Sequence, residues 1–245
     1  MNKGLFEASE EGTPQGGPLS PLLSNIMLNE LDKELERRGL PFVRYADDSM
    51  IFCKSKRAAR RVKESITRFI ENTLYLKVNK EKTEVSYVRG VKYLGYSFYV
   101  MKGKCQLMVH PKSKAKMKSK LKELTSRSNG WGYSKRKQKL KEYIEGWVGY
   151  YHLANMKRLL LDTDEWLRRR IRMCIWKAWK KVKTKVTNLI RCGINKYQAY
   201  EWGNTRKGYW RIADSPVLKR AIDNNKLRSV GYATLMGTYL EWHPK

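Results

Sequence analysis

The sequence is poor in acidic residues, in cysteine and in long apolar runs. It carries 23 Asp and Glu against 52 Lys and Arg, a formal net charge of +29. Its four cysteines include no CxxC pair, which argues against a zinc framework and favours reduced thiols. No apolar stretch approaches the roughly 20 residues that span a bilayer, and the N-terminus lacks a signal-peptide pattern. We therefore predict a cytoplasmic protein with no membrane partner.

The excess of positive charge predicts a polyanionic partner, and nucleic acid is the leading candidate because phosphate neutralisation drives its binding. A ribosomal-type or histone-like basic protein is the alternative. Eight Trp, fifteen Tyr and 41% hydrophobic residues argue instead for folded cores. At 245 residues, two or three small units are expected.

The most informative segment is an acidic pair between two short apolar runs. Asp47 and Asp48 lie in the middle of 42–52, a segment whose composition predicts a β-hairpin. Two carboxylates at such a tip are suited to hard cations such as Mg²⁺, which leave room for substrate phosphates. A two-metal site of this kind stabilises the attacking and leaving oxygens of a phosphoryl transfer. The alternative is a solvated turn, where Asp is common.

Apolar spacing predicts two helices around this hairpin. A glycine-rich loop at 12–18 precedes the first helix, which Gly39 is expected to stop. The apolar stripe of this helix comprises Leu23, Met27, Leu28, Leu31 and Leu35. A second helix is expected at about 55–72, and alternating apolar residues predict strands within 74–88 and at 93–98. This part of the chain is therefore predicted to be α+β.

After Pro111 the pattern becomes helical and strongly basic. A basic helix is expected at 112–127, a break at 128–132, and then a helix with an apolar stripe. Asp162 and Glu165 suggest a capping box for a further helix whose second face is rich in cations. That face is predicted to meet phosphates, with a solvated surface as the alternative. Cations alternate with aromatics in 205–211, a composition that suits nucleic-acid contacts or, equally, a small core.

The order of these features resembles the reverse transcriptase–maturase proteins of bacterial group II introns. The motifs that carry the resemblance are Gly12-Thr13-Pro14-Gln15-Gly16 with Ser20-Pro21-Leu22, Tyr45-Ala46-Asp47-Asp48, Leu76-Lys77-Val78-Asn79 with Glu81-Lys82-Thr83, Tyr93-Leu94-Gly95-Tyr96, Gly146-Trp147-Val148-Gly149-Tyr150-Tyr151, the helix at 168–181, and Arg206-Lys207-Gly208-Tyr209-Trp210-Arg211. They extend over essentially the whole chain, and together they are more specific than the acidic motif alone.

The resemblance implies a right-hand polymerase architecture of the α+β class. It implies a partial reverse transcriptase palm in 1–109, a helical thumb or maturase domain in 110–190, and a small DNA-binding-like region in 191–245. The implied activities are RNA-directed DNA synthesis from dNTP substrates and assistance to intron splicing and mobility. The implied partners are group II intron RNA and a DNA target or primer, and the implied location is the bacterial cytoplasm, with the nucleoid or a ribonucleoprotein.

The resemblance also assigns roles to individual residues. Asp47 is implied as the main ligand and Asp48 as a secondary ligand of Mg²⁺ in a two-metal site, and Lys82 as a group that protonates or stabilises pyrophosphate. For Lys82, a surface lysine in a turn is an equal alternative. The template and nucleotide are expected at Gln15, Gly16, Gly17 and Ala46, and the primer end at Tyr93, Leu94 and Gly95. RNA or DNA is expected at Arg168, Arg169, Arg172, Lys177, Lys180, Lys181, Arg206, Lys207, Trp210 and Arg211.

One family feature has no counterpart in the sequence. The family carries fingers and a first palm strand, with another metal-binding Asp, ahead of the glycine-rich loop, whereas only residues 1–11 precede that loop here. Asp32 looks like a surface residue of a helix, and no other residue replaces the missing Asp. We therefore expect an incomplete metal site, an inactive isolated chain and a partner that supplies an N-terminal fingers and palm fragment. We also expect no Cys/His endonuclease domain.

The sequence leaves two functions open. One is a polymerase that is competent only with a second polypeptide, and the retained acidic pair favours it. The other is a non-catalytic module that binds intron RNA and assists splicing, and the missing Asp favours it for the chain in isolation. A decayed fragment without function is a third alternative.

Overall fold

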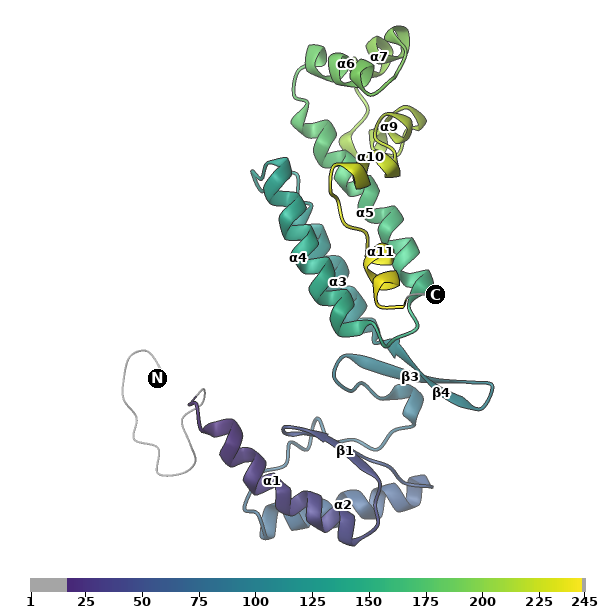
Figure 1. Ribbon diagram of the computed structural model, residues 1–245. Coiled ribbons are helices and arrows are strands. Elements are labelled where there is room, and N and C mark those ends of the chain that lie inside the picture. The colour runs from purple at the N-terminus through teal and green to yellow at the C-terminus, as the bar shows by residue number, and fades with distance from the viewer. Residues whose placement is uncertain (1–16, 244–245) are drawn as a thin grey trace. The chain divides into compact units, whose positions relative to one another are not determined.

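The protein is represented by a computed structural model that describes residues 17–243 and that divides into two compact units (Figure 1). The N-terminal unit comprises the described residues up to Tyr93, and the C-terminal unit begins at Leu94. Helices dominate, with two short antiparallel hairpins, so the predicted α+β class is confirmed. The domain boundaries expected at 109 and 190 stay predictions.

The main elements of the N-terminal unit are two helices and one hairpin, which the sequence predicts. Its elements are α1 (Ser20–Arg37), β1 (Phe42–Tyr45), β2 (Asp48–Ile51) and α2 (Lys56–Asn72). Gly39 ends the first helix with a φ of +62°, a conformation that costs glycine little. The hydroxyl of Ser55 accepts a hydrogen bond from Ala58 N and so caps the start of α2.

A small apolar core holds these elements together. Leu31 and Leu35 of α1 are buried with Ile66 of α2 and with Leu74, and Phe42 and Ile51 of the hairpin pack against them. The first turns of α1 do not take part in this core. Five large apolar residues in these turns or just before them are exposed: Leu19, Leu22, Leu23, Ile26 and Met27. The predicted stripe therefore covers the core only along the second half of α1.

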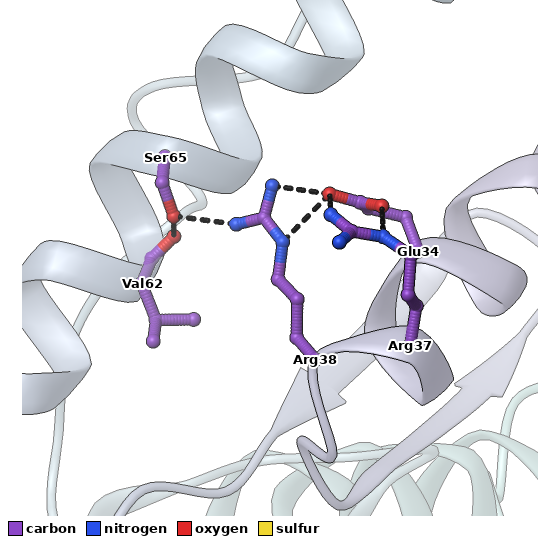
Figure 2. A network of polar contacts seen from close by, with 5 residues as sticks. All are labelled: Glu34, Arg37, Arg38, Val62 and Ser65. Atoms are coloured by element: carbon purple, nitrogen blue, oxygen red, sulfur yellow. Dashed lines mark hydrogen bonds and ion pairs between the residues drawn. The ribbon is translucent and has the colours of Figure 1, made fainter.

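Ion pairs support the end of α1 (Figure 2). Arg37 Nε donates to Glu34 Oε2 at 2.8 Å, and Arg38 Nε donates to Glu34 Oε1 at 2.7 Å. Hydrogen bonds from Arg37 and then from Arg38 lower the pKa of Glu34 to about 2. Arg38 also donates to Ser65 Oγ at 3.0 Å, so it connects the end of α1 to α2 (Figure 2).

The strands expected within 74–88 are wrong. Among these residues the structure has irregular chain, a turn at 80–82 and the start of the short 3₁₀ helix η1 (Val88–Gly90), and no strand. Leu74 is buried and Leu76 packs beside it against the helices. Their alternating pattern reflects contact with a helix layer, which produces the same periodicity as strand pairing.

The C-terminal unit begins with a hairpin and continues as helices. The hairpin elements are β3 (Tyr96–Met101) and β4 (Lys104–Val109). The helices are α3 (Pro111–Leu124), α4 (Tyr133–Tyr151), α5 (Lys157–Ala178), α6 (Val182–Arg191), α7 (Lys196–Gly203), α8 (Tyr209–Ile212), α9 (Pro216–Ala221), α10 (Asn224–Ser229) and α11 (Leu235–Glu241). The strand expected at 93–98 starts only at Tyr96, because Leu94 and Gly95 form a turn with positive φ angles of 49° and 81°.

The core of the C-terminal unit lies around α5, whose Leu167, Ile171 and Trp176 are buried. Figure 1 shows α11 lying between α4 and α5, and it packs against both. The capping box expected at Asp162 and Glu165 is wrong. The helix starts at Lys157, so these two residues lie within it.

The four cysteines are free thiols. Burial raises the pKa of the Cys174 thiol. Within residues 17–243, no helix is both long enough and apolar enough to cross a membrane.

Candidate active-site hairpin and nucleic-acid surface

The acidic pair lies at the tip of the predicted hairpin. Tyr45 pairs with Asp48, so Ala46 and Asp47 form a two-residue turn. Ala46 has a φ of +52°, in the left-handed region that costs an L-residue roughly 1–2 kcal/mol. Both carboxylate residues are exposed. Backbone strain of this kind persists only where neighbouring groups hold it in place.

Arg44 supplies such support beneath the turn. Its Nε and Nη2 donate to the two carboxylate oxygens of Asp32 at 2.8 and 2.5 Å, a bidentate pair that is 13% and 21% exposed. Its Nη1 donates to the carbonyl oxygen of Ala46 at 2.9 Å and to Asn25 Oδ1 at 3.1 Å. One guanidinium therefore connects α1 to the strained residue of the acidic turn.

Sequence reasoning missed this network and interpreted Asp32 as a surface residue of a helix. The structure corrects that interpretation, because Asp32 is the ion-pair partner of Arg44. A signal was available: an arginine in a short apolar strand, three positions before an acidic pair, requires a carboxylate partner when it is partly buried.

Tyr93 approaches the hairpin from the end of the N-terminal unit. Its hydroxyl lies 3.5 Å from the carbonyl oxygen of Asp48, a long hydrogen bond. Burial, with a contribution from the Asp48 carboxylate, raises the pKa of the Tyr93 hydroxyl. Tyr93 therefore lies beside the acidic strand, near the predicted catalytic pair.

The other two residues of the expected primer grip belong to the C-terminal unit. The carbonyl oxygen of Leu94 accepts from Tyr150 Oη at 2.9 Å, and that of Gly95 accepts from Ser113 Oγ at 3.0 Å. A side chain at Gly95 would collide with the hydroxyl of Tyr151. Close packing of the backbone against α3 and α4 therefore explains a glycine at this position.

The remaining residues of the expected polymerase site are only partly described. Gln15 and Gly16 lie outside the described residues, and Gly17 is half-buried ahead of α1. Lys82 is exposed in a turn in which its backbone N donates to Asn79 Oδ1 at 3.1 Å. This hydrogen bond holds Lys82 within its own turn and does not join it to the acidic hairpin, so its role stays a prediction.

The donor set tests whether the hairpin fits Mg²⁺ ions. Asp47 and Asp48 supply carboxylate oxygens, the ligands that Mg²⁺ prefers. Among the described residues, however, no group of three or more His, Cys, Asp and Glu side chains is placed to hold a metal ion. The nearby Asp32 is already occupied by Arg44. The described residues therefore do not complete a two-metal site.

The predicted phosphate-facing side of α5 is corrected by the structure. Arg172 is buried, donating to the Ile222 carbonyl at 2.9 Å and to Asn224 at 3.2 Å. Burial lowers the pKa of this guanidinium. Arg169 lies over the Trp210 ring at 4.0 Å and donates to the carbonyl of Trp210. Because α5 is a central helix, Arg169 and Arg172 connect it to neighbouring segments.

Lys177 also serves the fold, since its Nζ donates to the carbonyl oxygen of Arg127 at 2.6 Å. Arg168 is half-buried, and Lys207 lies over the Trp202 ring at 4.9 Å. Among the residues predicted to contact nucleic acid, five cations and one aromatic side chain are exposed. They are Lys180, Lys181, Arg206, Lys207, Trp210 and Arg211.

The Arg44 network makes a testable prediction about the acidic turn. We expect Arg44→Ala to lower the local opening free energy of the hairpin by about 2 kcal/mol, because the Asp32 carboxylate and the Ala46 carbonyl lose their donor. Arg44→Lys should fall between wild type and Arg44→Ala, since an ammonium group keeps the charge without the planar fork. Hydrogen exchange across residues 42–51 measures this effect.

The matched control is Arg37→Ala, which removes an arginine whose side chain is 71% exposed and ion-paired on the same helix as Asp32. It should change hairpin exchange little, because exposed ion pairs contribute little to stability. Unchanged exchange in Arg44→Ala, or equal changes in both alanine variants, would show that Arg44 does not support the turn.

Two protein families match successive parts of the chain. Residues 2–98 match the family described as Reverse transcriptase (RNA-dependent DNA polymerase). Residues 114–193 match the family described as Group II intron, maturase-specific domain. The first match contains the acidic hairpin, and the second contains α4 and α5.

The chain is also similar to individual proteins over part of its length. The chain is 34% identical to Protein YkfC of Escherichia coli (strain K12), over 39% of this chain and 34% of that protein. It is 28% identical to Group II intron-encoded protein LtrA of Lactococcus lactis subsp. cremoris, over 39% of this chain and 27% of that protein. It is 37% identical to Retron Mx65 reverse transcriptase of Myxococcus xanthus, over 29% of this chain and 17% of that protein.

The matched part spans about a third or less of the length of these relatives. The two family matches follow each other in the order that the sequence motifs predict. The chain is therefore similar to the reverse transcriptase family over residues 2–98 and to the maturase-specific domain of group II introns over residues 114–193.

Proposed function

We propose that the chain contributes the acidic catalytic hairpin and the RNA-binding maturase region of a group II intron reverse transcriptase. In this proposal Asp47 and Asp48 hold Mg²⁺ beside a primer end, and dNTP is the substrate. The observation that supports it most directly is the strained acidic turn braced by Arg44 within the reverse transcriptase match.

The proposal requires a second polypeptide segment that completes the metal site. Two features of the N-terminal unit support such a partner. The exposed leucines and isoleucine at the start of α1 form an apolar surface, which is typical of interaction sites. The β1–β2 hairpin is a two-stranded sheet within the described residues, and a sheet of two strands is marginally stable without further partners.

Primer extension on an RNA template tests the proposal. The purified chain with Mg²⁺ should make no DNA, whereas addition of an N-terminal fingers and palm fragment of a related reverse transcriptase should restore synthesis. Robust synthesis by the chain alone would show that its metal site is complete. A chain that binds the fragment and still makes no DNA would contradict the polymerase proposal.

The second candidate function is a non-catalytic module that assists splicing of a group II intron RNA. The maturase-specific match at 114–193 and the exposed cations that follow α5 favour it. An in vitro splicing assay with the purified chain separates the two candidates. Stimulated splicing that is insensitive to Asp47→Ala would support the splicing module independently of DNA synthesis.

A further inference from the structure

The polar face of α2 carries a concentration of positive charge that the proposed site does not use. The helix contains six cations and two carboxylates, and its apolar residues all lie on the opposite side. The carboxylates on the polar face are Glu64 and Glu71. The cations are Lys56, Arg57, Arg60, Arg61, Lys63 and Arg68. All of these cations except the half-buried Lys63 are exposed.

The two helices of the N-terminal unit differ in how many of their cations form ion pairs. On α1, Lys33 pairs with Glu30 at 2.7 Å, and Arg37 pairs with Glu34. On α2, by contrast, no described carboxylate forms an ion pair with Arg60 or Arg68, although Glu64 lies between them in sequence. The charge of α1 is therefore largely neutralised within the helix, whereas that of α2 remains available to an anion.

The chain that follows α2 turns this charged face into a groove. Residues 78–83 lie against the helix, and Lys63 Nζ donates to the Thr83 carbonyl at 2.5 Å, which fixes this arrangement. The open groove between them has a volume of about 450 Å³. It is lined by Lys63, Glu64, Thr67, Arg68, Val78, Lys80 and Thr83. Three cations, one carboxylate and two hydroxyl groups thus face the same space.

We propose that this groove, with the exposed arginines beside it, binds the phosphate backbone of RNA. Arg68 and Lys80 offer charged donors and Thr67 offers a hydroxyl, which are the groups that commonly contact phosphate oxygens. Arg60 and Arg68 are about 12 Å apart along the helix axis at 1.5 Å per residue, so α2 contacts more than one phosphate. The RNA partner itself rests on the proposed function, and the contact surface is additional to it.

The test compares two double variants of the full chain that remove the same charge. Arg60→Gln with Arg68→Gln removes two cations from the α2 face, and Lys33→Gln with Arg37→Gln removes two paired cations from α1. Binding to a base-paired RNA hairpin is measured over a range of salt concentrations. We expect the α2 variant to reduce the slope of log affinity against log salt by roughly 2, about 1 for each phosphate that the protein no longer neutralises.

The α1 variant should leave the slope close to that of wild type. Equal changes in the two variants would overturn the proposal, because they would reflect net charge alone. Thr67→Glu provides a second test, since it places a carboxylate in the groove without removing a cation, and it should weaken binding several-fold. Circular dichroism confirms that each variant retains its helices, and a Thr67→Glu variant that is folded and binds normally would also overturn the proposal.

A further variant separates this proposal from the proposed function. Lys180→Gln with Lys181→Gln removes two exposed cations from the C-terminal unit. If only this variant flattens the salt dependence, the groove proposal fails and the maturase surface stands. If only the α2 variant does so, the groove stands and the predicted maturase contact fails. Unchanged slopes in both variants would contradict both.

Discussion

Asp47→Ala is expected to abolish DNA synthesis by the reconstituted polymerase and to leave RNA binding nearly unchanged. Asp47 is exposed at the tip of a two-residue turn, so its carboxylate contributes little to the apolar core of its unit. Its removal should therefore affect chemistry and not folding. Primer extension and RNA-binding affinity are measured on the same preparation.

The control for Asp47→Ala is Glu84→Ala, which removes another exposed carboxylate from the same unit. This control should retain synthesis. Loss of both synthesis and RNA binding in a folded Asp47→Ala protein would contradict the assignment of Asp47 as a metal ligand. Normal synthesis by Asp47→Ala would contradict it as well.

Asp164→Ala is expected to destabilise the C-terminal unit by about 3 kcal/mol, because it leaves two backbone donors without a partner. Asp164 lies on α5 and is 1% exposed. Its carboxylate oxygens accept from Leu235 N and Met236 N, each at 2.9 Å. Thr234 caps the next free N–H, that of Gly237, so Asp164 completes the start of α11.

Urea denaturation followed by tryptophan fluorescence measures this effect, since all eight Trp lie beyond residue 130 and report the C-terminal unit. Asp164→Asn should lose less stability than Asp164→Ala, because its amide oxygen still accepts one hydrogen bond. Equal stability of wild type and Asp164→Ala would show that the start of α11 is satisfied in another way.

The same residue predicts a dependence on pH. Burial raises the pKa of Asp164 above its ordinary value of 3.8, so the folded protein binds this proton more tightly than the unfolded chain. The contribution of this residue to stability should therefore fall as pH rises from 3.8 through the higher folded pKa. Asp164→Asn cannot titrate, and this part of the pH profile should be absent from it.

Local patterns in the sequence were sufficient to predict most elements of the N-terminal unit. The stop at Gly39, the hairpin at 42–52 and the helix at about 55–72 all depend on neighbouring residues, and all three are present in the structure. The expected strands within 74–88 failed for a tertiary reason. Leu74 and Leu76 cover a helix layer instead of joining a sheet, and apolar alternation does not distinguish these environments.

The candidate site was less predictable, because the role of a charged residue depends on the groups that it contacts in the folded chain. Arg172 was expected to meet phosphate, yet it is buried and bound to residues about 50 positions later in the chain. The partners of Arg44 on α1 and of Asp164 at the start of α11 are likewise distant in sequence. Sequence patterns identify such charges without indicating whether solvent, nucleic acid or protein will neutralise them.

The position of α11 between α4 and α5 has a consequence for synthesis on the ribosome. Leu235, the partner of Asp164, is added 71 residues after it. At a translation rate of roughly 5–20 residues per second, several seconds pass between the synthesis of Asp164 and that of Leu235. During this interval the carboxylate of Asp164 and the apolar faces beside it lack their final cover. The nascent C-terminal unit therefore completes its folding only when translation has passed α11, the segment that covers α4 and α5.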